Sequence, residues 1–310
     1  MVKQIPSALT GVFAALPTPY RPDGTPDVEK LQPILDFHLD KQVAGLCIGG
    51  ATGEYAACSV EERLSLIRSV GRYLNGRASL ITGIGGEHFG QVHRLARAAA
   101  DAGAIAALLP APFYFPYGSS DLLDFLRRVA GELPLPVLFY NIPQFTNELH
   151  LDDVLRLIES VPNVIGLKDS SGRSANLPLL LKAKSAMSMA FFIGSDDLLF
   201  EALGSGADGA ISGVASACPD LIQAIYEAFR SGQKEKAKHL QVMLDDFIAH
   251  INGFPPPWGI KLALQARGIE IGSLNWPLGE PLRLKAEEFQ AWFLEWDAKN
   301  ETAWAKATSE

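Results

Sequence analysis

Short apolar runs alternate with longer amphipathic stretches along roughly the first 230 residues of the chain. Apolar runs bounded by turn residues are typical of buried strands, and apolar residues at helical spacing are typical of helices. The predicted strands are Gly11–Leu16, Ala44–Ile48, Ser79–Thr82, Ala104–Leu109, Pro136–Tyr140, Val164–Lys168, Ala190–Ile193 and Gly209–Ser212. The predicted helices are Asp27–Gln42, Ser59–Leu74, Gln91–Ala102, Ser120–Ala130, Leu151–Ser160, Ser174–Ser185, Leu198–Leu203 and Pro219–Arg230.

Eight strand-then-helix units with nearly continuous apolar strands predict a parallel sheet covered on both faces. An α/β fold of the (β/α)8 TIM barrel type is the natural closure, and 310 residues suffice for it. A doubly wound sheet is the alternative, but no G-x-G-x-x-G follows the first strand. Residues 233–310 contain only helical patterns, at Lys234–Ile251, Trp258–Ala266 and Lys285–Asn300. We therefore expect a catalytic barrel over residues 1–232 and a C-terminal helical extension over residues 233–310.

Composition and charge restrict the class of partner and the compartment. A net charge of −8 without any basic run argues against nucleic-acid and anionic-membrane partners. No apolar stretch approaches the roughly 18 residues of a membrane span, and no signal peptide is evident. Three cysteines without a C-x-x-C fit reduced thiols, so we expect a cytoplasmic protein. His88 and His93 are five apart, which does not place two ligands on one helix face, so we expect no metal site.

The predicted strand Val164–Lys168 ends in a lysine, followed by Asp169 and a Ser-Ser-Gly turn. An ammonium ion is costly to bury, and a neutral amine is a nucleophile of the kind that Schiff-base chemistry needs. Alternatively, Lys168 turns out to solvent or pairs with Asp169, as most lysines at strand ends do.

Other polar groups follow the ends of other predicted strands, where barrel enzymes carry their active sites. The turn Gly50-Ala51-Thr52 exposes N–H groups and a hydroxyl that suit a carboxylate, although a Gly-rich turn alone is weak support. Tyr140 ends the fifth strand and has the chemistry of a proton carrier, although a single buried tyrosine is more often structural. Asp196, in Gly194-Ser195-Asp196-Asp197, either accepts hydrogen bonds from substrate hydroxyls or caps the next helix. Ile211 and Ser212 end the eighth strand.

Four of these segments together carry a resemblance. They are G-x-T-G-E at Gly50–Glu54, Y-N-x-P at Tyr140–Pro143, G-x-K-D-S at Gly166–Ser170 and G-S-D-D at Gly194–Asp197. In this order and at these separations, the chain resembles the dihydrodipicolinate synthase / N-acetylneuraminate lyase family of Schiff-base aldolases. The resemblance covers essentially the whole chain, including the helical tail.

The resemblance implies roles for individual residues. Lys168 would form the imine with pyruvate or another 2-keto acid, and no other cofactor would be needed. Tyr140 would be the acid–base residue, and Thr52 with the neighbouring amides would hold the carboxylate. Tyr114 matches the family's loop tyrosine, which reaches into the neighbouring subunit's site in a homotetramer built as a dimer of dimers. Gly194, Asp196 and Asp197, with Ile211 and Ser212, would line the substrate pocket.

Two departures from the family pattern bear on the substrate. Ala51 stands where most members have a hydroxyl residue of the proton relay. Phe145 stands where dihydrodipicolinate synthases carry the arginine that binds the second substrate's carboxylate, and a phenyl ring replaces no guanidinium. Lysine biosynthesis is therefore disfavoured. The Gly194–Asp197 stretch looks more like that of the sugar-acid lyases, whereas Phe145 with Phe113 and Phe115 would suit a less polar acceptor.

The main hypothesis is a class I aldolase that splits a 4-hydroxy-2-keto acid, sugar-acid-like, into an aldehyde and the enamine of pyruvate. The same imine expelling a C4 hydroxyl would make a 2-keto-3-deoxy sugar-acid dehydratase instead. A catalytically impaired 2-keto-acid-binding homologue, disabled by Ala51, is a further alternative. A pyridoxal phosphate enzyme using Lys168 fits poorly, because no basic phosphate cradle is visible.

Overall fold

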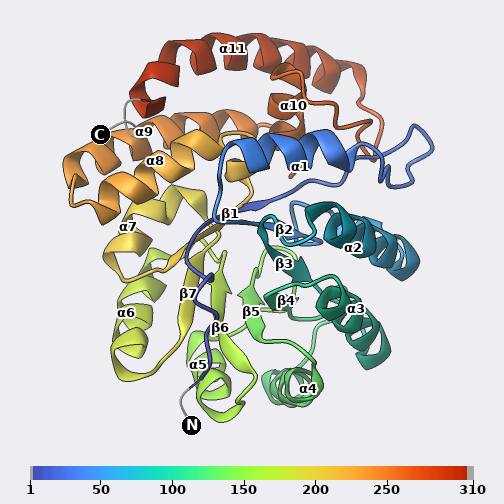
Figure 1. Cartoon of the computed structure of the whole chain (residues 1–310), viewed down its shortest axis with the longest axis vertical. Helices are drawn as coiled ribbons and strands as arrows, with labels where there is room; N and C mark the ends of the chain where they lie inside the picture. The colour runs from blue at the N-terminus through green and yellow to red at the C-terminus, as the bar shows by residue number, and fades with distance from the viewer. Residues whose placement is uncertain (1–2, 306–310) are drawn as a thin grey trace.

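The computed structural model describes residues 3–305, and its centre is a closed barrel of eight parallel strands in sequence order (Figure 1). The strands are β1 (Gly11–Ala15), β2 (Gly45–Ile48), β3 (Ser79–Gly83), β4 (Ala106–Pro110), β5 (Val137–Asn141), β6 (Val164–Asp169), β7 (Ala190–Ile193) and β8 (Gly209–Ser212). Closure comes from the pairing of β1 with β8. The (β/α)8 TIM barrel predicted from the sequence is confirmed.

One helix follows each strand and covers the outside of the barrel. These helices are α1 (Leu31–Asp40), α2 (Val60–Leu74), α3 (Phe89–Asp101), α4 (Ser119–Glu132), α5 (Leu151–Ser160), α6 (Leu177–Ala186), α7 (Leu199–Gly204) and α8 (Pro219–Arg230). Helix α2 begins as its sequence predicts, because Ser59 and Glu62 form a reciprocal capping box. Single 3-10 turns lie at four loops: η1 (Tyr55–Ala57), η2 (Ser174–Asn176), η3 (Asp196–Leu198) and η4 (Val214–Ser216).

Two predicted helix starts differ from the observed ones by four or more residues. The first helix begins at Leu31 rather than Asp27, because the Asp27 carboxylate accepts the N–H of Glu29 and pairs with Arg21, which holds a turn there. The last helix, α11, begins at Glu280 rather than Lys285 and runs to Ala305. Its start has little apolar periodicity, so the sequence pattern locates only its middle.

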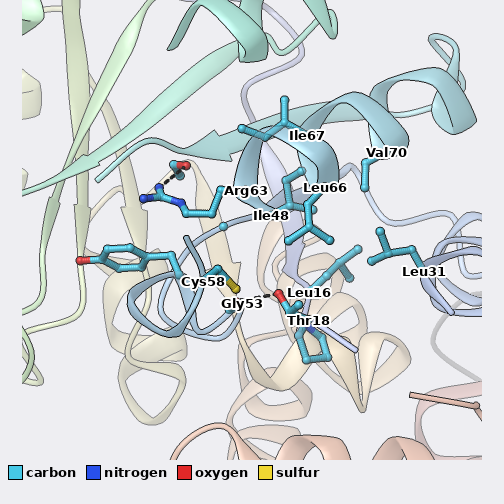
Figure 2. A pocket seen from close by; sticks show the side chains of 14 residues that line it. Leu16, Thr18, Leu31, Ile48, Gly53, Cys58, Arg63, Leu66, Ile67 and Val70 are labelled. Atoms are coloured by element: carbon cyan, nitrogen blue, oxygen red, sulfur yellow. Dashed lines mark hydrogen bonds between the residues drawn. The ribbon is translucent and has the colours of Figure 1, made fainter. Parts of the chain in front are cut away.

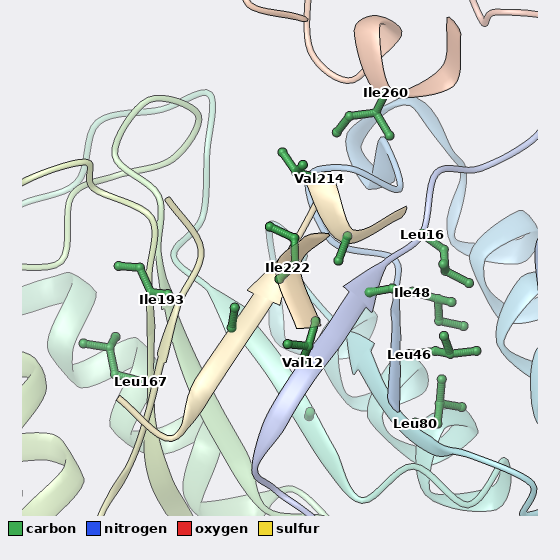
Figure 3. Close-up of a cluster of buried hydrophobic side chains, with 14 of the residues drawn as sticks. Val12, Leu16, Leu46, Ile48, Leu80, Leu167, Ile193, Val214, Ile222 and Ile260 are labelled. Atoms are coloured by element: carbon green, nitrogen blue, oxygen red, sulfur yellow. The ribbon is translucent and has the colours of Figure 1, made fainter. Parts of the chain in front are cut away.

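The alternation of side chains divides the core into two layers. Large side chains such as Val12, Leu46, Leu80 and Leu167 point outward and pack under the helices (Figure 3). A second cluster fills the barrel interior: Phe13, Cys47, Ile81, Leu108, Leu138, Tyr140, Phe192 and Ile211 are among its members. The interior is therefore a packed core, which leaves ligand space only at the strand ends.

Glycine is required where β6 approaches β7. A Cβ added to Gly166 would lie 2.0 Å from the carbonyl oxygen of Ala190, which no side chain tolerates. The register between β5 and β6 also shifts at Val137 and Leu138, after which Leu138 pairs with Gly166. These two features determine which residues of β5 and β7 lie opposite the last residues of β6.

The helical extension consists of α9 (Lys234–Ile251), α10 (Trp258–Ala266) and α11. These helices lie next to α8 and α1 (Figure 1), and Ile260 of α10 points toward Val214 in the loop after β8 (Figure 3). Lys261, fully buried on α10, forms an ion pair with Glu54 in the loop after β2, and its ammonium lies 4.5 Å from the centre of the Tyr20 ring. The expected boundary at residues 232 and 233 falls in the turn between α8 and α9, and the two parts share buried contacts.

Over residues 3–305, none of the helices combines the length and apolar character that a membrane span requires. Cys47, Cys58 and Cys218 are free thiols.

We expect Lys261→Met to lower the free energy of unfolding by about 3–5 kcal/mol, because it leaves the Glu54 carboxylate buried without a partner. The double variant Lys261→Met with Glu54→Gln should regain part of this loss. Urea unfolding followed by circular dichroism measures both. Lys30→Met, which removes an exposed pair with Glu270, is the matched control and should cost less than about 1 kcal/mol. Equal losses for Lys261→Met and Lys30→Met would contradict the role given to the buried pair.

Candidate active site

An open pocket of about 860 Å³ lies over the C-terminal ends of the strands and under the extension. Loops after β2, β4, β5, β6, β7 and β8 contribute to the lining, and so does the segment from α9 to the loop after α10. The predicted site residues among its lining are Ala51, Thr52, Tyr140, Phe145, Lys168, Gly194, Asp196 and Asp197. Most of the residues singled out from the sequence are therefore brought together.

A second, enclosed cavity lies below the Gly-rich turn, between β1, β2 and α2 (Figure 2). Its volume of about 20 Å³ is the space of a single water molecule. Thr18 donates to the carbonyl of Gly53, and the terminal nitrogens of Arg63 donate to those of Gly83 and Gly85, while the Arg63 Nε has no hydrogen-bond partner among the described residues. This cavity is not the substrate site.

Lys168 and Tyr140 are neighbours across two paired strands. They are directly opposite in the β5–β6 register, and both are buried, with 4% and 3% of their surfaces exposed. The Lys168 Nζ lies 4.2 Å from the centre of the Tyr140 ring. An aromatic face attracts a cation at this distance. The pair places an amine and a phenol together at the pocket floor.

Asp169 is not the partner of Lys168. Its Oδ1 accepts bonds from the Asn141 amide and the Ser171 N–H, and its Oδ2 accepts bonds from the Ser171 hydroxyl and the Asn176 amide. Successive residues of a strand face opposite ways, so Asp169 belongs to the outer layer when Lys168 faces inward. The Lys168 side chain is therefore neither turned out to solvent nor paired with Asp169, which were the two alternatives for it.

The Gly-rich turn after β2 brings Thr52 to the pocket. A Cβ on Gly213, at the end of β8, would lie 2.8 Å from the Thr52 Oγ1, so a glycine there makes room for this hydroxyl. Glu54 adopts the left-handed backbone conformation (φ 53°), a strained position held by its ion pair with Lys261. Ala51 packs against the interior cluster that contains Tyr140, so this wall of the pocket is apolar.

Asp196 is a buried carboxylate in the same pocket, 8% exposed. Its Oδ2 accepts the N–H of Val214 at 3.3 Å, whereas its Oδ1 has no hydrogen-bond partner. Burial raises the pKa of Asp196 to about 6, against smaller lowering effects of the Ser212 hydroxyl, the Val214 N–H and the Lys168 charge. The neighbouring Asp197 is exposed to solvent.

Four predicted site residues lie outside the pocket lining. Tyr114 is 83% exposed, its backbone is left-handed (φ 55°), and it is not part of the lining of this chain's own pocket. Ile211 belongs to the packed barrel interior, and the Ser212 oxygen accepts the N–H of Ala215. Gly50 contributes backbone next to the pocket but no lining. Ile211 and Ser212 are fully buried at the end of β8, and the lining begins with the next residues, Gly213 and Val214.

Tyr55 is a pocket residue that the sequence analysis missed. It is buried on η1, with the Arg63 guanidinium 5.0 Å from its ring centre, and burial raises the pKa of its hydroxyl. Its position directly after the G-x-T-G-E turn was the available signal. Gln144 was missed as well, and its amide donates to the carbonyl of Ser170, which braces the loop after β6.

The extension supplies the outer wall of the pocket. Asn252, Trp258 and Trp276 line it, opposite the half-exposed Phe145. No local sequence signal identifies such residues, because only the docking of the helices brings them to the site. Within residues 3–305, no group of three or more His, Cys, Asp or Glu side chains is arranged as metal ligands.

Comparisons with known proteins agree with this geometry. Residues 8–292 match the Dihydrodipicolinate synthetase family model. A 4-hydroxy-tetrahydrodipicolinate synthase of Azoarcus sp. (strain BH72) is 33% identical over 271 residues, which are 87% of this chain and 92% of the relative. A prophage protein of the dihydrodipicolinic acid synthase family from E. coli K12, solved with pyruvate, is 26% identical, with a TM-score of 0.85 over 93% of this chain and 98% of its own. A Ruminococcus gnavus sialic acid aldolase shares the fold at 24% identity and a TM-score of 0.85, over 94% of this chain and 99% of its own.

We expect Asp196→Asn to stabilise the protein at pH 8 relative to its effect at pH 4. A carboxyl whose pKa is raised in the folded state, here from 3.8 to about 6, destabilises that state increasingly as pH rises through this range. At about 1.4 kcal/mol per pH unit, removing the charge should add up to about 3 kcal/mol at pH 8. Urea unfolding of both proteins at the two pH values measures the difference. A pH-independent effect of the substitution would contradict the raised pKa of Asp196.

Proposed function

This chain belongs to the dihydrodipicolinate synthetase family, and we propose that, as a pyruvate-dependent carbon–carbon lyase of this family, it cleaves or forms a sugar-acid-like 4-hydroxy-2-keto acid. The observation that carries the proposal is the buried Lys168 amine on the pocket floor, directly across the strand pair from Tyr140. An amine in this position can form an imine with a keto acid, and a phenol beside it can move the protons that imine formation requires.

The reaction follows from these groups. The neutral Lys168 amine attacks the keto carbon, and Tyr140 protonates the leaving hydroxyl of the carbinolamine. The Tyr140 phenolate then takes the proton of the C4 hydroxyl, the O–H electrons form the aldehyde carbonyl, and the electrons of the C3–C4 bond pass to the iminium ion, which leaves the enamine of pyruvate. Protonation at C3 and hydrolysis then release pyruvate and regenerate Lys168. Thr52, with the amides of its Gly-rich turn, is placed to hold the keto acid's carboxylate.

Two carboxylates in the pocket lining favour an acceptor that carries hydroxyls. Asp196 and Asp197 lie on one loop in the lining, and carboxylates accept hydrogen bonds from polyols. Dihydrodipicolinate synthase activity is the second candidate, since the Azoarcus relative bears a name of that type. Phe145 opposes it, because this half-exposed ring occupies the position from which a guanidinium would bind a second carboxylate.

We further propose a homotetramer in a cytoplasmic setting, with no cofactor beyond the lysine imine. The support for assembly is Tyr114, whose ring stacks edge-on against Phe115 and is otherwise turned outward. Exposed aromatic side chains gathered on one loop are typical of interfaces.

The first test is borohydride trapping. Incubation with pyruvate and reduction should add a pyruvyl group to Lys168, found by peptide mass spectrometry. Lys168→Ala and the charge-retaining Lys168→Arg should show no adduct, because neither offers a neutral amine at that position. Circular dichroism confirms that the variants are folded. Absence of the adduct in the wild-type protein would overturn the proposed chemistry.

We expect Phe145→Arg to shift acceptor preference toward aldehydes that carry a carboxylate. A charged hydrogen bond contributes about 1.5–3 kcal/mol, so the ratio of kcat/KM for succinic semialdehyde to that for glyceraldehyde should rise about tenfold or more. Phe145→Leu is the matched control, because it removes the ring without adding a charge. An unchanged ratio in Phe145→Arg would show that residue 145 does not contact the acceptor.

A further inference from the structure

We propose that Trp276 is a specificity-determining residue whose ring contacts the remote end of the acceptor, and that this acceptor is an uncharged polyhydroxy aldehyde. The inference rests on the proposed function and names the class of acceptor in it. Trp276 lies in the loop between α10 and α11. It lines the pocket and is nevertheless 69% exposed, whereas the other four tryptophans of the chain are buried or half-buried.

The loop that carries Trp276 is anchored on both sides of the ring. The N–H of Ser273 donates to the carbonyl of Tyr20 at 2.8 Å. Leu274 and Leu278, two residues before and two residues after the tryptophan, pack against the hydrophobic core. The indole is therefore presented to the pocket by a fixed segment while most of its surface has no covering partner. Aromatic side chains presented in this way are typical of ligand contacts.

The part of the lining that belongs to the extension is apolar. Apart from the amides of Asn252 and Asn275, its side chains are isoleucines, prolines and the rings of Trp258 and Trp276. The keto end of a substrate is fixed at the strand ends, where Lys168 forms the imine. The remote end of the substrate is therefore the part that can reach the extension.

The charges of the lining oppose an anionic group at that end. Among the described residues, Lys168 is the only cationic side chain of the lining, and it is committed to the imine. Glu54 is neutralised by Lys261, whereas Asp196 and Asp197 add negative charge to the lining. A phosphate or a second carboxylate on the acceptor would meet no free cation here and would be repelled by these two groups.

An uncharged polyhydroxy chain suits both parts of the lining. Its hydroxyls can donate to the exposed carboxylate of Asp197. The face of an aromatic ring carries partial negative charge, so it attracts the polarised C–H groups of carbons that bear hydroxyls. Trp276 offers such a face, and the half-exposed Phe145 offers a second one on a turn closed by its N–H bond to the carbonyl of Ile142.

Substitution of Trp276 tests the contact through the length of the acceptor. In the condensation with pyruvate, Trp276→Ala should lower kcat/KM for erythrose about tenfold or more, chiefly through KM, which is the usual contribution of an apolar contact in a pocket. The values for glycolaldehyde, which has no remote end, and the exchange of the C3 hydrogens of pyruvate in D2O should stay close to wild type. Trp276→Phe retains a ring and should lose less. Leu294→Ala removes a half-exposed apolar side chain of α11 outside the lining and is the matched control.

A positive charge placed at residue 276 gives a readout in the opposite direction. In the wild-type protein, kcat/KM for erythrose 4-phosphate should lie below that for erythrose. Trp276→Arg should raise the ratio of the first to the second about tenfold or more, because a charged hydrogen bond to the phosphate becomes available. Leu294→Arg adds the same charge outside the lining and should leave the ratio unchanged.

The outcomes separate this inference from the proposed function. Equal losses for erythrose and glycolaldehyde in Trp276→Ala would overturn it, because they would assign the tryptophan to stability or assembly. A wild-type preference for erythrose 4-phosphate would overturn the class of acceptor, as would trapping of pyruvate without any turnover of erythrose. Failure of pyruvate trapping in the wild-type protein would instead count against the proposed function.

Discussion

The register between β5 and β6 determines what chemistry this barrel can perform. Tyr140 and Lys168 meet because Leu138 pairs with Gly166 after the shift at the start of these strands. A slip of one residue would turn Lys168 into the helix layer and bring Asp169 into the barrel, replacing an amine with a carboxylate. Gly166 protects the register, since any side chain there would collide with the backbone of β7.

The helical extension lines the pocket and contacts the loops that form it. Lys261 neutralises Glu54 and so fixes the loop that carries Thr52, and Gln241 fixes the loop that carries Asp196. Each contact joins a helix of the extension to the end of a different strand. Since α9 and α10 of the same extension hold these two loops, a loosening of their packing would widen the site at two points together.

The sequence predicts the barrel because each strand and helix is marked by a pattern within its own short segment. Strand ends are marked by a change from apolar runs to Gly, Asp or Ser, which located Lys168, Tyr140 and Asp196 on the pocket. How deeply a residue is buried below the strand ends is not marked in the local sequence. Ile211 and Ser212 were therefore predicted to line the pocket, whereas both are fully buried at the end of β8. Trp276 and Asn252 were missed because helix docking alone brings them to the pocket. Tyr114, whose own backbone is left-handed, is exposed outside the lining of this pocket. The division of the chain at residue 232 stays a prediction.

The two buried carboxylates of the pocket, Glu54 and Asp196, differ in what compensates their charge. Glu54 is balanced by Lys261, so its charge contributes to holding the fold together and is unavailable to a substrate. The Oδ2 of Asp196 accepts one long hydrogen bond, and its Oδ1 accepts none from the described residues. The buried charge of Asp196 therefore lowers stability as the pH rises through about 6, whereas the charge of Glu54 is compensated by Lys261.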